Sequence, residues 1–191
     1  LHKEYRRQRQ MCIRDRREIG LALGEQPTAK GYPPSVISLI PKLVERAGCD
    51  RESGGSVTAF YTVLADGDDA SDPVVDAARA ITDGHIVLSR ALAEQGVYPA
   101  IDVGASVSRV SPQICSKSHL EAARVFRRRY ALYQENKDLA LMGGYQAGVD
   151  LEIDLALSRY PQMMNFIQQP VDQQCNWEDA EQALAKVVAD A

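Results

Sequence analysis

The sequence lacks the residue clusters on which most recognisable catalytic and metal sites are built. Its four cysteines lie far apart without a C-x-x-C pair, and its three histidines have no H-E-x-x-H spacing. Neither a G-x-S-x-G motif nor a G-x-x-x-x-G-K-S/T loop occurs. These absences exclude the usual zinc signatures, a serine hydrolase elbow and a phosphate loop from these 191 residues. We predict free thiols in a reducing compartment.

Long apolar runs are missing as well. No stretch approaches the ~18 apolar residues needed to cross a bilayer, so no membrane span is expected. The basic start of the chain is not followed by the apolar core of a signal peptide. Net charge is −4, with Lys and Arg concentrated in residues 1–17. This arm has few aromatic residues, so we expect no nucleic-acid partner and interpret residues 1–16 as disordered or foreign.

Helix and strand signals alternate over the first half of the chain. Apolar periodicity and Gly or Pro stops predict helices at 17–27, 35–48, 73–84 and 89–96. Ser35 and Gly48 are the expected caps of the second of these helices. The densest β signal, 54–65, is apolar on both faces, and shorter strands are predicted at 85–89 and 99–102. This order predicts parallel strands covered by helices, which is an α/β fold.

From residue 117 onward every signal is helical. A long amphipathic helix is predicted at 118–144 with Ser118 as its cap, and two shorter helices bounded by Pro161 and Pro170 follow. A last helix begins after a cap at Asn176. We therefore predict part of an α/β domain followed by a small all-α domain, at residues 17–113 and 114–191.

Several residues have both a structural and a functional interpretation. The acidic run at Asp66, Asp68, Asp69 and Asp72 lacks the frame of a calcium loop and is read as a solvated turn. The pair Cys115 and His119 is not expected to form a catalytic dyad. The arginines at 127–129 spread around a helix, so a solvated or interface face is favoured over an anion site.

Two residues near the third predicted strand each have a structural and a ligand-binding interpretation. Tyr98 precedes Pro99 in a turn, and is interpreted either as packing on a sheet edge or as a stacking surface for a planar ring. Arg109 lies on a polar bend, and is either a surface ion pair or a ligand for phosphate oxygens, to which a guanidinium offers a planar fork.

Longer blocks resemble one known family. "GYPPSV", "GSVTAFYTVL", "DGHIVLSR", "YPAID" followed by "SVSR", and the tail "YQAGVDLEIDLAL" with "NFIQQ" resemble the flagellum-specific and type III secretion ATPases, relatives of the catalytic subunit of rotary ATP synthases. The likeness runs from Arg17 to the end of the chain. The tyrosine of "GYPPSV" favours the flagellar branch, and a virulence-type secretion ATPase is the alternative.

The resemblance implies a fold and three site residues. It implies the C-terminal half of a RecA-like P-loop NTPase domain with parallel strands, then an all-α domain. Arg109 matches the arginine finger that reaches the γ-phosphate held by the neighbouring subunit. Tyr98 matches an adenine-pocket residue, and Phe166 resembles a second adenine-side aromatic. Val171 stands where relatives often place another aromatic.

The resemblance also implies a cofactor, partners and a location. The cofactor is ATP with Mg²⁺, whose phosphate and metal ligands lie upstream in the family and do not occur in this sequence, so these residues alone are expected to be inactive. The partners are a homo-hexamer of the full-length protein, the export apparatus, export chaperones and substrates. The expected location is cytoplasmic, at the membrane export apparatus. The alternative function is a non-catalytic docking module formed by residues 117–191.

Overall fold

The computed structural model describes residues 13, 15–50, 54–64 and 72–189. The chain divides into two compact units, Leu1–Thr82 and Asp83–Ala191. Within the described residues no helix is both long enough and apolar enough to span a membrane. The domain boundary expected between residues 113 and 114 stays a prediction.

The first unit is built from short helices. Residues 15–22 are helical, so the helix predicted at 17–27 is present but begins two residues earlier, inside the segment expected to be disordered or foreign, and ends five residues earlier. A 3-10 turn, η1, spans Ala29–Gly31. Helices α2 (Pro34–Ile37) and α3 (Leu39–Val44) pack against α4 (Pro73–Ile81). The side chains buried among these helices are Val36, Ile40 and Val74.

The helix predicted at 35–48 is two helices, and its expected caps are wrong. The helical region begins at Pro34, because proline at the first position has a helix-compatible φ and lacks only an N–H that no helical carbonyl would accept. Pro41 has no N–H to donate to the carbonyl of Ile37, and α2 ends at that residue. Gly48 lies in strand β1 (Gly48–Cys49), after α3 has ended.

Helix α4 begins where the sequence predicts. The Asp72 carboxylate accepts a 2.8 Å hydrogen bond from the backbone N–H of Val74 and lies 3.8 Å from the Lys30 ammonium. Asp72 is almost fully buried, so it serves as a helix cap and not as part of a solvated turn. The other acids of that run, Asp66, Asp68 and Asp69, lie outside the described residues.

The strand predicted at 54–65 is wrong over most of its length. Only β2 (Ser56–Val57) is extended and paired, with β1, in an antiparallel ladder. Residues 58–64 have no regular structure, and Phe60 and Leu64 are 90% and 73% exposed. A strand that is apolar on both faces needs a neighbour along each edge and a layer on each face, and the described part of this unit provides neither.

The second unit begins with a two-stranded hairpin. Strand β3 (Gly84–Leu88) leads through α5 (Arg90–Glu94) to β4 (Ile101–Ser108), and the two strands pair antiparallel. The parallel pairing expected here is therefore wrong.

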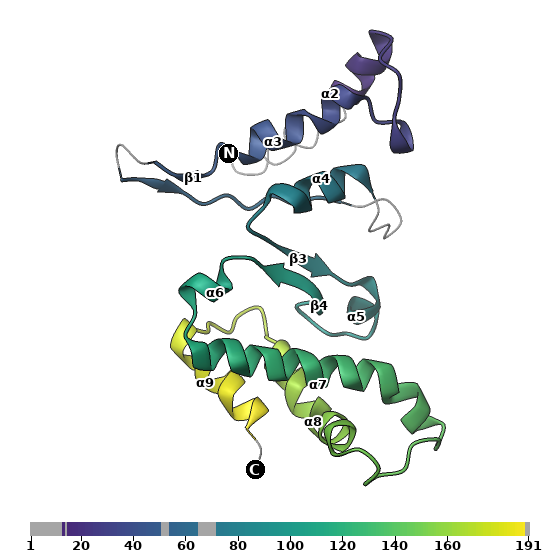
Figure 1. The fold of residues 1–191 in the computed structure, drawn as a ribbon, viewed down its shortest axis with the longest axis vertical. Helices are drawn as coiled ribbons and strands as arrows, with labels where there is room; N and C mark the ends of the chain where they lie inside the picture. Colours follow the sequence, from purple (N-terminus) through teal and green to yellow (C-terminus); the bar gives the residue numbers. More distant parts are fainter. Residues whose placement is uncertain (1–12, 14, 51–53, 65–71, 190–191) are drawn as a thin grey trace. The chain divides into compact units, whose positions relative to one another are not determined.

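The short helix α6 (Ser111–Ile114) follows β4, and a bundle of longer helices comes after it in the described part of the second unit (Figure 1). Helix α7 (Lys117–Leu141) packs on α8 (Leu151–Ile167), α9 (Trp177–Val188) and β4. The buried side chains at their centre are Phe126, Tyr130, Met163 and Leu184. Val103 of β4 packs against the same cluster, so the hairpin shares the core of the helical bundle.

Two local predictions for these helices need correction. Helix α7 begins earlier than predicted, because the side chain of Ser116, and not of Ser118, accepts the capping hydrogen bond from the N–H of His119. Pro161 lies inside α8 and does not end it. The missing N–H of Pro161 costs one helical hydrogen bond, but the residues on either side bury Ala156 and Met163 in the bundle. The cap predicted at Asn176 is confirmed.

Candidate functional site

Arg109 lies in a bend between β4 and the short helix α6 (Ser111–Ile114). Its backbone N–H donates to the carbonyl of Asp83 at 2.8 Å, which continues the hairpin ladder by one residue. Its side chain is exposed. The bend thus fixes the backbone of Arg109 and directs its guanidinium to the surface.

Two serines close this bend. The hydroxyl of Ser111 donates to the carbonyl of Ser108 at 3.2 Å, and the N–H of Ser111 donates to the Ser108 hydroxyl at 3.3 Å. Short polar side chains commonly satisfy backbone groups in this way where a helix starts after a strand. Both bonds bridge the residues on either side of Arg109.

A bulge in β4 precedes the bend. His85 pairs with Val107 and Val87 pairs with Asp102, so the pairing register shifts between these two positions. The residues of β4 between Asp102 and Val107 bulge out opposite Ile86 of β3. The hydroxyl of Ser106 ties this bulge together, because it donates to the Asp102 carbonyl at 2.6 Å and accepts from the Val87 N–H at 3.0 Å. Bulges of this kind redirect the residues that follow them.

Gly84 holds the other side of the hairpin. A Cβ added at Gly84 would lie 2.6 Å from the carbonyl oxygen of Val107 and 3.2 Å from the Cα of Ser108. Both atoms are backbone and cannot rotate away. The β4 backbone therefore approaches β3 at a distance that only glycine permits, just before Arg109.

We expect Gly84→Ala to destabilise the second unit by about 1–3 kcal/mol, the usual cost of forcing an extra methyl group into a packed site. The strands must separate, so hydrogen exchange at the amide of Arg109 should accelerate. Gly104→Ala is the matched control, since its added Cβ would meet only a carboxylate oxygen of Asp102, at 3.4 Å. Equal exchange rates in both variants would contradict the close-contact argument.

Tyr98 lies in the turn after α5. Its side chain is 59% exposed, while the preceding Val97 is buried and anchors the turn. The backbone carbonyl of Tyr98 accepts a 3.1 Å hydrogen bond from the N–H of Gln169, which follows α8. The ring is therefore accessible to a planar ligand. Its role in adenine binding stays a prediction.

Phe166 is placed differently. Its half-buried ring packs edge-on against Phe126, with 5.5 Å between the ring centroids, at the margin of the bundle core. Because Gln169 is bonded to the Tyr98 turn, the end of α8 that carries Phe166 and the Tyr98 turn lie together. The structure therefore brings together the segments of both predicted adenine residues. Val171, beyond them, is fully exposed.

The three consecutive arginines of α7 point to separate partners. Arg127 donates to the Ser106 carbonyl at 3.1 Å, and Arg128 pairs with the Glu152 carboxylate. Arg129 is 8% exposed and donates to the Val188 carbonyl at 2.8 Å. The prediction that they form no single patch is confirmed, whereas a solvated face is wrong for Arg129, which satisfies a carbonyl at the end of α9.

Cys115 and His119, which are not expected to form a catalytic dyad, flank the start of α7. The His119 ring stacks on Trp177 of α9 with 5.1 Å between centroids, and its Nδ1 lies 3.8 Å from the Glu181 carboxylate. The three cysteines within the described residues are free thiols, as predicted, and Cys12 lies outside them.

Tyr130 of α7 is buried near the Asp102 carboxylate of β4. Burial raises the pKa of Tyr130, and the negative charge of the nearby Asp102 raises it further. The phenol therefore stays protonated at neutral pH. Across the parts of the chain that the structure describes, no group of three His, Cys, Asp or Glu side chains is arranged to hold a metal ion.

Two sequence profiles match the chain in succession. That of the ATP synthase alpha/beta family, nucleotide-binding domain, matches residues 10–108. The chain belongs to this family. The profile of the T3SS EscN ATPase C-terminal domain then matches residues 115–186. The Arg109 bend lies between these two matched regions of the ATP synthase alpha/beta family member.

Flagellar and secretion proteins are among the relatives of this ATP synthase alpha/beta family chain. It is 53% identical over 173 residues to the flagellum-specific ATP synthase of Pseudomonas aeruginosa, covering 91% of this chain and 38% of that protein. It is 50% identical over 159 residues to the SPI-2 type 3 secretion system ATPase of Salmonella typhimurium, covering 83% and 36%. The chain thus spans less than two-fifths of these relatives.

Solved structures agree with the sequence relatives. The assembled ATPase EscN from the type III secretion system of enteropathogenic E. coli matches with a TM-score of 0.88 at 44% identity, covering 93% of this chain and 42% of EscN. EscN in complex with its central stalk EscO matches with a TM-score of 0.80 at 43% identity, covering 93% and 42%. The predicted family resemblance and fold class are confirmed, apart from the strand pairing corrected above.

Two residues that fix the backbone before Arg109 were not predicted from the sequence. Ser106 and Gly84 both fall inside blocks that resemble the family, but their hydrogen bonds and close contact depend on strand pairing. The sequence assigned Gly84 to the end of the helix predicted at 73–84, whereas the structure places it in β3. Arg127 carried no signal that distinguishes it from its neighbours on the helix.

Proposed function

We propose that this chain is the C-terminal region of an ATPase that energises flagellar type III protein export, and that it supplies the arginine finger in trans. The observation that carries this proposal is the position of Arg109. In a chain of this family, it lies exposed on a bend whose backbone is fixed by hydrogen bonds to Asp83 and between Ser108 and Ser111.

The chemistry that Arg109 can contribute is electrostatic. A guanidinium presents a planar set of N–H donors that match phosphate oxygens, and it stays charged at any physiological pH. Placed beside a γ-phosphate, it stabilises the charge that develops during phosphoryl transfer. A fixed backbone limits the reorganisation needed at that moment, which is what makes such stabilisation effective.

The residues present fit part of an ATP site. Tyr98 offers an exposed aromatic ring for adenine, and Phe166 lies on the neighbouring segment with its ring half-buried. The phosphate-loop motif does not occur in the sequence, and the described residues offer no carboxylate cluster for Mg²⁺. We therefore propose that residues outside this chain hold the phosphates and the metal, and that these 191 residues alone do not hydrolyse ATP.

If one subunit holds the phosphates and another supplies the arginine, the subunits must assemble. An arginine that completes another subunit's site requires a neighbouring copy of the protein, and the relative EscN has been solved as an assembled ATPase and in complex with a central stalk. We propose a homo-hexamer of the full-length protein on the cytoplasmic side of the membrane export apparatus. Export chaperones and substrates are its proposed further partners.

A mixed-ring experiment tests the in-trans role. It uses a full-length chimera in which this chain replaces the matching segment of the Pseudomonas aeruginosa relative. One chimera carries Arg109→Ala, and a second carries an Ala in place of the phosphate-loop lysine that the relative contributes. Each should be inactive alone. Co-assembly should restore turnover, because an interface between the two can combine an intact loop with an intact arginine.

The mixed ring also has a clear opposing result. Mixtures no more active than either parent, with hexamers confirmed by mass, would overturn a role across the interface. Full activity of the Arg109→Ala chimera alone would overturn the assignment of the arginine itself.

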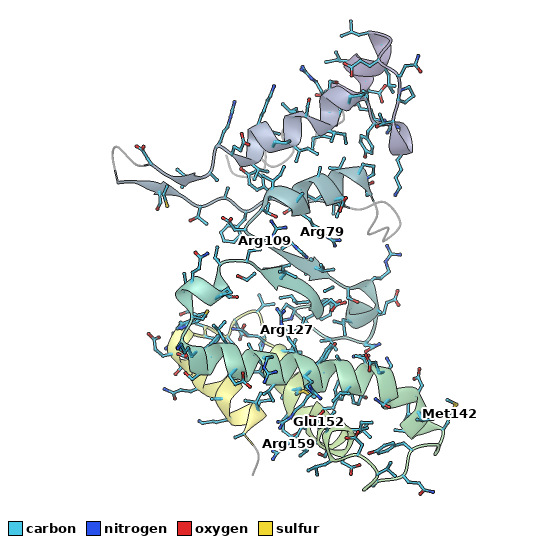
Figure 2. All side chains as sticks on the ribbon, viewed as in Figure 1. Arg79, Arg109, Arg127, Met142, Glu152 and Arg159 are labelled. Atoms are coloured by element: carbon cyan, nitrogen blue, oxygen red, sulfur yellow. The ribbon has the colours of Figure 1, made fainter. Side chains whose placement is uncertain are left out.

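The second candidate function is docking by the helical region alone. The junction of α7 and α8 exposes apolar side chains, with Met142 at the far end of the bundle in Figure 2. The residues of this group are Leu141, Met142, Val149 and Leu151, all at least 73% exposed. Exposed apolar groups of this kind favour contact with another protein, for which the export apparatus is the proposed partner. Docking and catalysis are compatible within one ring.

A further inference from the structure

Arg127 connects the helical bundle to the strand that carries Arg109. It extends from α7 toward the β3–β4 hairpin in Figure 2, and its Nη2 donates to the backbone carbonyl of Ser106 at 3.1 Å. The adjacent helix residue, Phe126, is buried in the core that also contacts Val103 of β4. The strand is therefore attached to α7 by one apolar and one polar contact.

Ser106 is the residue that joins α7 to the bulge of the hairpin. Its carbonyl accepts from Arg127, while its hydroxyl bonds to Asp102 and Val87 across the bulge. The carbonyl of Ser106 is thus engaged by the helix and its hydroxyl by the hairpin. A displacement of α7 would pull directly on the bulge.

The path from Ser106 to Arg109 is three residues long and is constrained throughout. His85 pairs with Val107, and Gly84 pairs with Ser108 at a distance that excludes a Cβ. The amide of Arg109 is then bonded to Asp83. Because these three residues are all held by β3 or by Asp83, a shift of Ser106 would also shift the backbone from which the Arg109 side chain extends.

We propose that Arg127 is a positioning residue for Arg109. Arg127 holds β4 against α7, so that movement of the helical bundle changes the position of the Arg109 side chain. This inference rests on the proposed function for its catalytic consequence. Its structural part rests only on the contact between Arg127 and the carbonyl of Ser106.

The neighbouring arginines provide a matched control. Arg124 lies one turn earlier on α7 and makes a bidentate pair with Glu121 of the same helix. That hydrogen-bonded pair holds the pKa of the Glu121 carboxyl below its usual value. Arg124 therefore resembles Arg127 in charge and exposure, but its pair with Glu121 lies within its own helix.

The first test uses the 191-residue chain and hydrogen exchange. Arg127→Gln should accelerate exchange about fivefold at the amides of Val87 and Arg109, in line with the loss of one hydrogen bond. Arg124→Gln should leave both rates unchanged. Exchange in the core of α7 should stay the same in both variants, which separates a local release of β4 from general unfolding. Unchanged exchange at both amides would overturn the proposal.

The second test measures turnover in the full-length chimera. Arg127→Gln should lower kcat about tenfold while KM for ATP stays within twofold, since the change affects the placement of a group that acts in the transition state. Arg127→Lys should recover part of the loss, because an ammonium can still donate to the Ser106 carbonyl but lacks the planar fork. Wild-type kcat in Arg127→Gln would overturn the positioning role.

A double variant distinguishes this inference from the proposed function. If Arg127 acts through Arg109, adding Arg127→Gln to Arg109→Ala should reduce kcat no further. A full additional tenfold loss would overturn the inference while leaving the arginine finger in place. Normal turnover of Arg109→Ala would instead overturn the proposed function, and the exchange result would still decide whether Arg127 holds the strand.

Discussion

Arg109→Ala is expected to reduce ATP turnover of the full-length chimera by ~10³–10⁵-fold, the range that arginine fingers contribute to phosphoryl transfer. The loss should appear in kcat, because the guanidinium meets charge that develops only in the transition state. Nucleotide affinity should change little, since the proposed function assigns the bound phosphates to the phosphate loop of a neighbouring subunit. Steady-state ATPase assays at saturating ATP, with affinity measured by a fluorescent nucleotide, separate the two quantities.

Two further variants sharpen this result. Arg109→Lys keeps the charge but loses the planar fork, so its turnover should lie between those of the wild type and the alanine variant. Arg124→Ala removes an arginine of similar exposure that pairs within its own helix, and it should retain normal turnover. If all three substitutions have the same small effect, Arg109 acts only as a surface charge.

Phe126→Ala is expected to destabilise the second unit by about 3–5 kcal/mol, the usual cost of removing a buried phenylalanine. Phe126 is 3% exposed and contacts both Tyr130 and Phe166 through its ring. The cavity would open between α7, α8 and β4, so the hairpin that carries Arg109 would lose its support. Stabilities of single domains are typically about 5–15 kcal/mol, so this loss is large.

Urea unfolding followed by tryptophan fluorescence measures that loss. Trp177 is the single tryptophan of the chain and stacks on His119, so its emission reports on the packing of α9 against α7. Phe60→Ala removes the same side chain from a position that is 90% exposed, and it should leave the midpoint unchanged. A midpoint for Phe126→Ala equal to that of the wild type would contradict the described core.

Local signals in the sequence predicted the elements whose stability is local. Asp72 followed by Pro73 begins α4, and Asn176 begins α9, because a cap and the first helical turn are decided by adjacent residues. The short strand and helix around Ser89 were predictable for the same reason. The bend that carries Arg109 was also visible, as a polar stretch after a strand.

Predictions failed where an element depends on distant neighbours. Residues 58–64 have the composition of a buried strand but pair with no strand among the described residues, and they are irregular. Pro161 should end a helix by its local chemistry, yet α8 continues through it because Ala156 and Met163 are both buried in the bundle. In both cases the decisive energy comes from contacts that a local pattern does not contain.

The sequence by itself indicated the family, the caps of several helices, and the candidates Arg109, Tyr98 and Phe166, because adjacent residues and short motifs carry that information within a few positions. Only the tertiary structure decided which side chains fix the Arg109 bend. Ser106, Gly84 and Arg127 act there through strand register, a backbone contact and a helix-to-strand hydrogen bond. Such contacts join residues that are near in space but about twenty positions apart in the chain, so no local pattern encodes them.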